Sequence, residues 1–134
     1  MNAREYVEQI KDIDALIKSV CTDIEEREER ALRVTTAIRS YLVPSRTKQR
    51  MADAIDEYVD IERGELKELI RKRQEIIDTM KLLPSKEYGV LFRRYALGCE
   101  FYEIATAYDR SESWAKAMNR TALESLQEIL DERR

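Results

Sequence analysis

The chain has 134 residues, of which 38% are charged and 7% aromatic, with only three glycines and two prolines. This composition is typical of a helix-rich protein with few strands. The net charge is −3, so the whole molecule has no strong positive field that would attract nucleic acid. Any DNA-binding face must therefore come from local placement of charge.

Several classes of function are excluded or disfavoured by what the sequence lacks. It contains no histidine, which excludes histidine-based catalysis and zinc sites of the Cys/His type. Cys21 and Cys99 are far apart and suit a reducing cytosol as packing residues. No Gly-rich phosphate loop or carboxylate cluster is apparent, so we expect neither an enzyme nor a bound metal or cofactor. No apolar run approaches the length of a membrane span, so we expect a cytoplasmic protein without a membrane partner.

Two long stretches carry apolar side chains at alternating steps of three and four, the a and d positions of a heptad repeat. The first repeat, within residues 3–42, runs through Tyr6, Ile10, Ile13, Ile17, Val20, Ile24, Arg27, Ala31, Val34, Ile38 and Leu42. The second runs through Ile55, Val59, Glu62, Leu66, Leu69, Arg73, Ile76, Met80 and Leu83. Pro44 lies between them and is expected to end the first helix.

The polar interruptions of the two repeats indicate how the helices pair. If the chain folds back so that paired residue numbers sum to about 89 or 90, Arg27 faces Glu62. We predict an ion pair between them, because an unpaired charge in the repeat would be costly and a pair fixes the register. Arg73 falls opposite Ile17 without a partner, and is expected to reach solvent or to mark contact with a second molecule. Residues 1–84 are therefore predicted to form a long antiparallel coiled-coil hairpin.

Residues 85–134 are predicted to form a separate small helical domain. Ser85 is placed to cap a helix over residues 86–97, and Gly98 is placed to end it. The sequence that follows has the pattern of a helix-turn-helix, in which a short helix and a second helix cross steeply.

The two crossing helices are indicated by small and apolar residues at helical spacing. Ile104 and Ala105 form the inner face of the first helix, and the small Ala105 lets the helices approach closely. Asp109-Arg110-Ser111 makes the turn, and Asp tolerates a left-handed backbone. The inner face of the second helix comprises Ala115, Met118, Ala122, Leu123 and Leu126. The predicted fold is thus all-α, a coiled-coil hairpin followed by a helix-turn-helix.

The C-terminal stretch resembles region 4 of sigma-70-type transcription factors. The resemblance rests on Glu103-Ile-Ala, Tyr108-Asp-Arg-Ser111 and Ala122-Leu-Glu-Ser-Leu126, preceded by Leu91-Phe-Arg-Arg-Tyr-Ala-Leu-Gly98. A coiled coil joined to a region-4-like end is also similar to small phage-encoded regulators, the ArpU-like and RinA-like late-gene activators. The stretches 1–10 and 51–56 fit an uncharacterised phage relative of these regulators.

This resemblance implies a phage or prophage transcription regulator that binds double-stranded DNA in the host bacterial cell. It implies a coiled coil that forms a homodimer or higher oligomer, or that contacts RNA polymerase. The DNA-binding positions carried over onto this sequence are Arg110, Glu112, Ser113, Lys116, Ala117 and Arg120. Glu112 stands where a basic residue is usual, and Ala117 cannot read a base by hydrogen bonds.

Two other functions fit the same sequence. A DNA-packaging component of the small-terminase type also combines a helix-turn-helix with a coiled coil, but usually with the DNA-binding unit first. A protein–protein interaction module would use the region-4-like end without touching DNA. Between Arg110 and Arg120 the balance is three basic residues to one acidic residue, which an ordinary surface helix can also carry.

Overall fold

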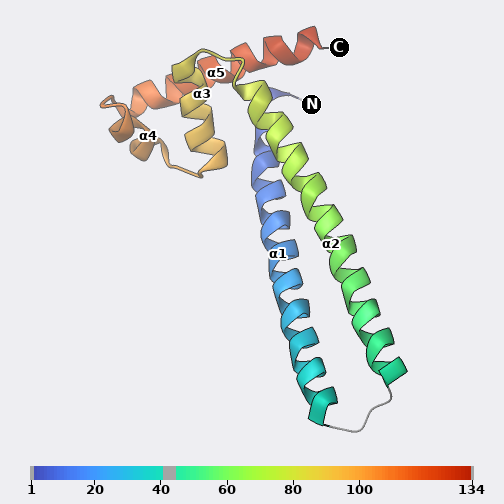
Figure 1. Cartoon of the computed structure of the whole chain (residues 1–134). Coiled ribbons are helices and arrows are strands. Elements are labelled where there is room, and N and C mark those ends of the chain that lie inside the picture. The colour runs from blue at the N-terminus through green and yellow to red at the C-terminus, as the bar shows by residue number, and fades with distance from the viewer. Residues whose placement is uncertain (1, 41–44, 134) are drawn as a thin grey trace. The chain divides into compact units, whose positions relative to one another are not determined.

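The structure is a computed structural model that describes residues 2–40 and 45–133, without the side chains of residues 34–40, 45–49, 51, 52 and 55. All regular structure in these residues is helical (Figure 1), so the predicted all-α class is confirmed. The elements are α1 (Ala3–Ser40), α2 (Ser45–Met80), α3 (Ser85–Leu91), η1 (Phe92–Ala96), α4 (Phe101–Ala107) and α5 (Glu112–Glu132). The predicted helix end at Pro44 lies outside the described residues.

The chain forms two compact units. The first unit consists of Met1–Asp14 and Arg71–Arg134, and the second consists of Ala15–Ile70. The domain boundary that we predict between residues 84 and 85 falls inside the first unit.

The first unit contains a fully buried apolar core. Its largest fully buried side chains are Val7, Ile10, Met80, Val90, Leu91, Ile104 and Leu126. The backbone N–H of Ala3 donates to Gln127 Oε1 at 2.7 Å, and Tyr6 Oη lies 3.1 Å from Thr79 Oγ1. These contacts tie the start of α1 to α5 and to the end of α2. The N-terminal residues therefore belong to the same unit as the C-terminal helices.

One prediction about the long helices is wrong. Arg73 has a partner in the first unit, because its Nε donates to Asp14 Oδ1 at 2.6 Å. Asp14 follows the heptad position Ile13 and lies beside the repeat rather than in it. A register drawn from heptad positions alone could not find this partner.

The short helices before α4 also differ from the prediction. Ser85 is the first residue of α3 and does not cap it, because Pro84 occupies the preceding position and no side chain caps this helix. The helix then continues as η1, a turn of π-helix in which Leu97 N–H donates to the carbonyl of Phe92 at 3.1 Å. Gly98 ends it with a φ of 70°, as expected for a glycine at this place.

In the second unit, α1 and α2 lie side by side and run in opposite directions (Figure 1). Arg27 Nε lies 2.8 Å from Glu62 Oε1, which is the contact that the heptad register predicts. The neighbouring residues meet as well, because Arg63 Nη2 lies 2.6 Å from Glu28 Oε1. Consecutive residues of the two helices are thus joined by ion pairs.

The Arg27–Glu62 contact includes a third charged group. Arg27 Nε also lies 3.2 Å from Asp23 Oδ2. A hydrogen bond with Asp23, together with burial, raises the pKa of Glu62 above its ordinary value, although the charge of Arg27 acts in the opposite direction. The second carboxylate oxygen of Glu62 is buried without a hydrogen-bond partner among the described residues. The helices therefore enclose a polar group whose hydrogen bonding is incomplete.

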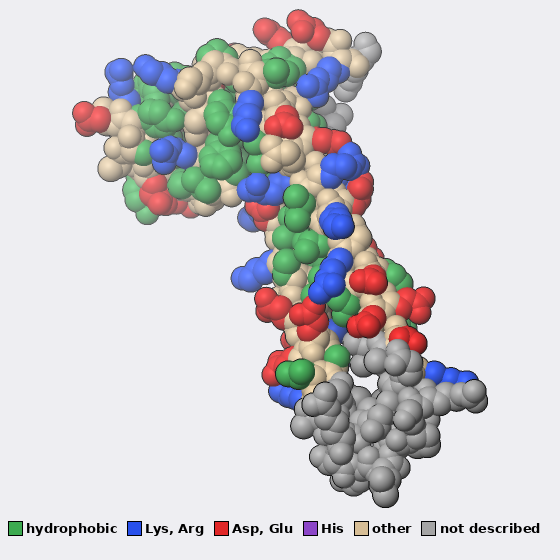
Figure 2. All heavy atoms as spheres, in the orientation of Figure 1, with side chains coloured by type: hydrophobic (Ala, Val, Ile, Leu, Met, Phe, Trp, Pro, Cys, Tyr) green, Lys and Arg blue, Asp and Glu red, His purple; other side chains and the backbone are tan. Residues whose placement is uncertain are grey.

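The second unit also exposes large apolar side chains. In Figure 2, hydrophobic side chains emerge among charged ones along the long helices. Those of the second unit that are at least half exposed are Leu16, Leu32, Tyr58, Ile61 and Ile70. Only Ile24 and Val59 are buried apolar residues among the described part of this unit.

Candidate nucleic-acid interface

The first unit positions α5 through the turn that precedes it. Asp109 adopts a φ of 54°, the left-handed conformation expected there. The N–H of Arg110 donates to the carbonyl of Ala105 at 2.9 Å. Ser111 then caps α5, because its Oγ accepts a hydrogen bond from the N–H of Trp114 at 3.1 Å. The start of α5 is thus fixed by backbone geometry and a side-chain cap.

α4 is held in the same way at its own start. The N–H of Glu100 donates to the carboxylate of Glu103 at 3.1 Å, one half of a capping box. The predicted inner face of this helix is confirmed, since Ile104 is fully buried and Ala105 is 4% exposed.

A small core joins α3, α4 and α5. It is formed by the buried residues Val90, Ile104, Ala105 and Ala115, with Cys99, Phe101, Tyr108, Trp114 and Met118 packed against it. Ala115, Ala122 and Leu126 are fully buried on α5, so the predicted inner face of this helix is correct at these positions. One face of α5 is thus used for packing, and the residues on its other side are available.

The packing between α3 and the end of α4 requires a glycine. A Cβ at Gly89 would overlap the hydroxyl of Tyr108. The sequence reading did not single out Gly89, because nothing in its local pattern indicates which side chain will approach it.

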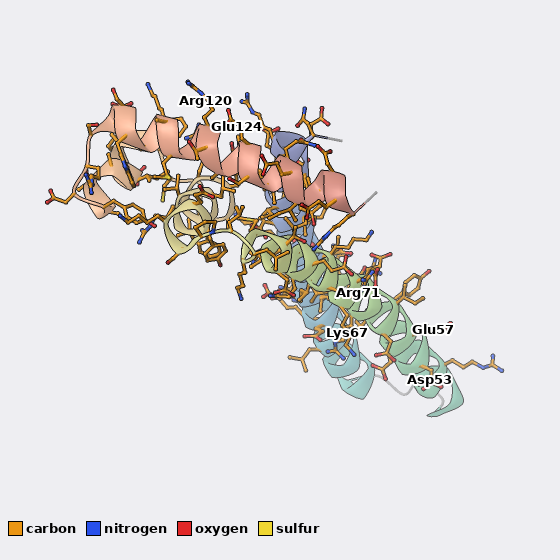
Figure 3. All side chains as sticks on the ribbon, turned by 90° about the horizontal axis from the view of Figure 1, so that it is seen from above. Asp53, Glu57, Lys67, Arg71, Arg120 and Glu124 are labelled. Atoms are coloured by element: carbon orange, nitrogen blue, oxygen red, sulfur yellow. The ribbon has the colours of Figure 1, made fainter. Side chains whose placement is uncertain are left out.

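All six residues that the resemblance assigns to DNA are exposed. They are Arg110, Glu112, Ser113, Lys116, Ala117 and Arg120. Arg120 and Glu124 project from the side of α5 that faces away from α3 and α4 (Figure 3). The structure thus places the predicted set on one accessible surface at the beginning of α5, next to the turn.

The charges on this surface are partly neutralised. Lys116 Nζ lies 3.6 Å from Glu112 Oε1, and both side chains are more than half exposed. Among the described residues, neither Arg110 nor Arg120 forms an ion pair with a carboxylate. These two guanidinium groups are therefore the ones most available to an anionic ligand.

Aromatic rings hold the arginines beside the turn. The Arg110 guanidinium lies 5.8 Å from the centre of the Trp114 ring, and Trp114 packs on Tyr108 with ring centres 5.4 Å apart. On the far side of this pair of rings, the guanidinium of Arg93 in η1 lies 5.5 Å from the centre of the Tyr108 ring. Arg110, Trp114, Tyr108 and Arg93 therefore follow one another in contact, with a cation at each end and two rings between them. Such cation–ring contacts restrict the positions of the two arginines.

Arg93 is the member of this surface that the sequence reading missed. It is partly buried, whereas Arg110 is exposed. Only the fold shows that η1 places Arg93 beside Tyr108, because the two residues are far apart in sequence. A search for arginines flanking aromatic residues would not distinguish Arg93 from Arg94, which instead lies 4.2 Å from the Phe101 ring centre.

The described residues contain no group of three or more Cys, Asp or Glu residues placed to hold a metal ion. None of their helices combines the length and the apolar character needed to cross a bilayer.

Comparisons with protein-family models, with curated proteins and with solved structures found no match to this chain.

Proposed function

We propose that this chain is a DNA-binding transcription regulator of a phage or prophage, in which α4 and α5 form a helix-turn-helix that contacts double-stranded DNA. The paired α1 and α2 would form an antiparallel coiled-coil hairpin that mediates oligomerisation or contact with RNA polymerase. The protein would act in the cytoplasm of the host bacterial cell, without a cofactor and without catalysing a reaction.

The observation that supports the proposal is the division of α5 into two faces. Ala115, Ala122 and Leu126 are fully buried, whereas all six predicted DNA-binding residues are exposed. A major groove about 12 Å wide admits one α-helix, and the residues at the start of that helix then reach the base edges. A helix with its contact residues turned inward could not act in this way.

The roles of the exposed residues follow from their chemistry. Lys116 and Arg120 are four residues apart on one side of α5, so both can face the same groove. Arg110, held over Trp114, is placed to contact a phosphate beside the turn. Ser113 can hydrogen-bond to a base or to a phosphate. Glu112 limits the positive charge because it pairs with Lys116.

The test is a gel-shift titration of the full chain with random-sequence and phage genomic duplex DNA at about 50 mM and about 200 mM salt. We expect affinity to fall steeply with salt and to be lost in the variant Lys116→Ala/Arg120→Ala. The control variant Lys11→Ala/Lys18→Ala removes two exposed cations from α1 and should bind normally. Unchanged DNA binding by the α5 variant would show that the DNA site lies elsewhere on the protein.

A second function is favoured by one observation on α4. Tyr102 is 61% exposed on this helix, and tyrosine is a residue type that is enriched in protein–protein interfaces. In this function the C-terminal helices bind RNA polymerase or another regulator and do not touch DNA. Absence of any gel shift, together with polymerase capture that is lost in Tyr102→Ser, would establish this second function in place of the first.

A further inference from the structure

The exposed side of α2 carries a row of residues at steps of four and three. The row consists of Asp53, Glu57, Asp60, Gly64 and Lys67, all in the second unit, and three of them are labelled in Figure 3. Every member of the row is exposed. Val59, on another side of the same helix, is 5% exposed. The row is therefore a second face of α2, distinct from the side that packs within the chain.

The charges of this row change sign at its centre. Asp53, Glu57 and Asp60 precede Gly64, whereas Lys67 follows it. Glu57 and Lys67 form no ion pair with any described residue. A face with acidic residues on one side of its centre and a lysine on the other is complementary to a copy of itself turned end to end.

The direction of such pairing is decided by the order of the charges. In a parallel pair, each acidic residue would lie opposite the same acidic residue of the other copy, and like charges repel. In an antiparallel pair centred near position 62, Glu57 lies opposite Lys67 of the second copy, and Lys67 lies opposite Glu57. Each contact then occurs twice, as a twofold axis requires.

A glycine, Gly64, lies in the middle of the row and supports the same contact independently of charge. Glycine weakens the interior of a helix relative to alanine. A Cβ at Gly64 would have no atom of its own chain within 4 Å, so packing within the chain does not require this glycine. A missing side chain at the middle of the row allows the backbone of another helix to approach closely. In the antiparallel register, Gly64 lies opposite Asp60 of the second copy.

We propose that the exposed face of α2 around Gly64 binds the same face of a second copy of this chain, with the two helices antiparallel. Ile61 is 56% exposed beside the row and supplies apolar area to the contact. The inference specifies the oligomer interface of the proposed function, but it does not depend on DNA binding. Charge complementarity sets the direction and register of the pair.

The test measures the dimer dissociation constant of the full chain without DNA, by sedimentation equilibrium at low salt. Glu57→Lys places two lysines opposite each other in both halves of the interface, and Lys67→Glu places two carboxylates there. We expect each single reversal to raise the dissociation constant at least about tenfold. The double reversal Glu57→Lys/Lys67→Glu restores opposite charges and should return it to within about threefold of the original value.

The matched control reverses Lys18 and Glu25, two exposed residues of α1 outside the proposed contact, and should leave the dissociation constant unchanged. Gly64→Leu fills the space at the centre of the row and should weaken the dimer without any change of charge. Helical content is measured for every variant, so that loss of the fold is distinguished from loss of pairing.

Three results would overturn the inference: a wild-type monomer throughout the concentration range, single reversals that leave the dimer intact, or a double reversal that fails to restore it. The variant Lys116→Ala/Arg120→Ala should form the same dimer as the wild type. Loss of DNA binding and loss of pairing are therefore observed separately.

Discussion

The two units of this chain are stabilised in different ways. The first unit holds all seven of the largest fully buried side chains, whereas Ile24 and Val59 are the buried apolar residues in the described part of the second. The second unit instead joins its helices by ion pairs such as Arg27–Glu62 and leaves large apolar side chains exposed. Apolar packing specifies a unique arrangement in the first unit, and complementary charges specify a register in the second.

The strongest test of this difference between the units is to truncate a leucine in each of them. Leu126 of α5 is fully buried, whereas Leu16 of α1 is 53% exposed. We expect Leu126→Ala to lower the free energy of unfolding by about 2–5 kcal/mol, because it leaves a cavity. Leu16→Ala should change it by no more than about 0.5 kcal/mol. Urea denaturation measures both values, and equal losses would show that the two units do not differ.

A smaller effect is expected from adding a methyl group to a glycine of each unit. Gly89→Ala should destabilise the first unit by about 1–3 kcal/mol, because the new Cβ overlaps the Tyr108 hydroxyl. Tyr108→Phe removes that oxygen and should rescue part of the loss. Gly64→Ala meets no atom of its own chain and should stabilise the monomer by about 1 kcal/mol. Thermal unfolding at low protein concentration measures the changes, and the same sign at both glycines would contradict the prediction.

The smallest effect concerns the pH dependence of the second unit. The pKa of Glu62 is raised by its hydrogen bond with Asp23 and by burial. A raised carboxyl pKa contributes stability below the ordinary value of 4.5, and this contribution is lost as the pH rises through the folded pKa. Glu62→Gln keeps a neutral hydrogen-bonding group, so the variant should gain on the wild type as the pH rises from about 4 to about 7.

The comparison for this experiment is Asp23, whose pKa shifts in the opposite direction from that of Glu62. The pKa of Asp23 is lowered, first by its hydrogen bond with Glu62 and then by the one with Arg27. Its contribution is present above the ordinary value of 3.8 and is lost as the pH falls through the folded pKa. Asp23→Asn should therefore lose stability relative to the wild type as the pH rises. Parallel curves for the wild type and Glu62→Gln would contradict the prediction, because they would show that the Arg27 charge offsets the other two causes.

Much of the fold could be predicted because its signals are local. Heptad spacing indicates the two long helices, and the turn is predicted at Asp109-Arg110-Ser111, where Asp109 has the positive φ that Asp tolerates. The Arg27–Glu62 contact could be derived because two polar residues interrupt apolar repeats at matching positions. In each case a few neighbouring residue types carry the information.

The remainder depends on contacts between distant residues. Nothing near Ala3 indicates that its N–H donates to Gln127, so the place of the N-terminal residues in the first unit could not be predicted. The π-helical turn of η1 has no composition of its own, and it places Arg93 beside Tyr108. For the candidate site, the sequence indicated which residues are exposed on α5 but not which aromatic rings lie beside the arginines.

Trp114 gives the first unit a built-in optical probe, because it is the only tryptophan in the chain. It lies between Tyr108 and Arg110, at the start of the helix that we assign to DNA. Its fluorescence therefore reports from that one place, and emission changes on adding duplex DNA or denaturant need no attached dye. The second unit contains no tryptophan, so tryptophan emission does not report on its unfolding, which must be followed by circular dichroism.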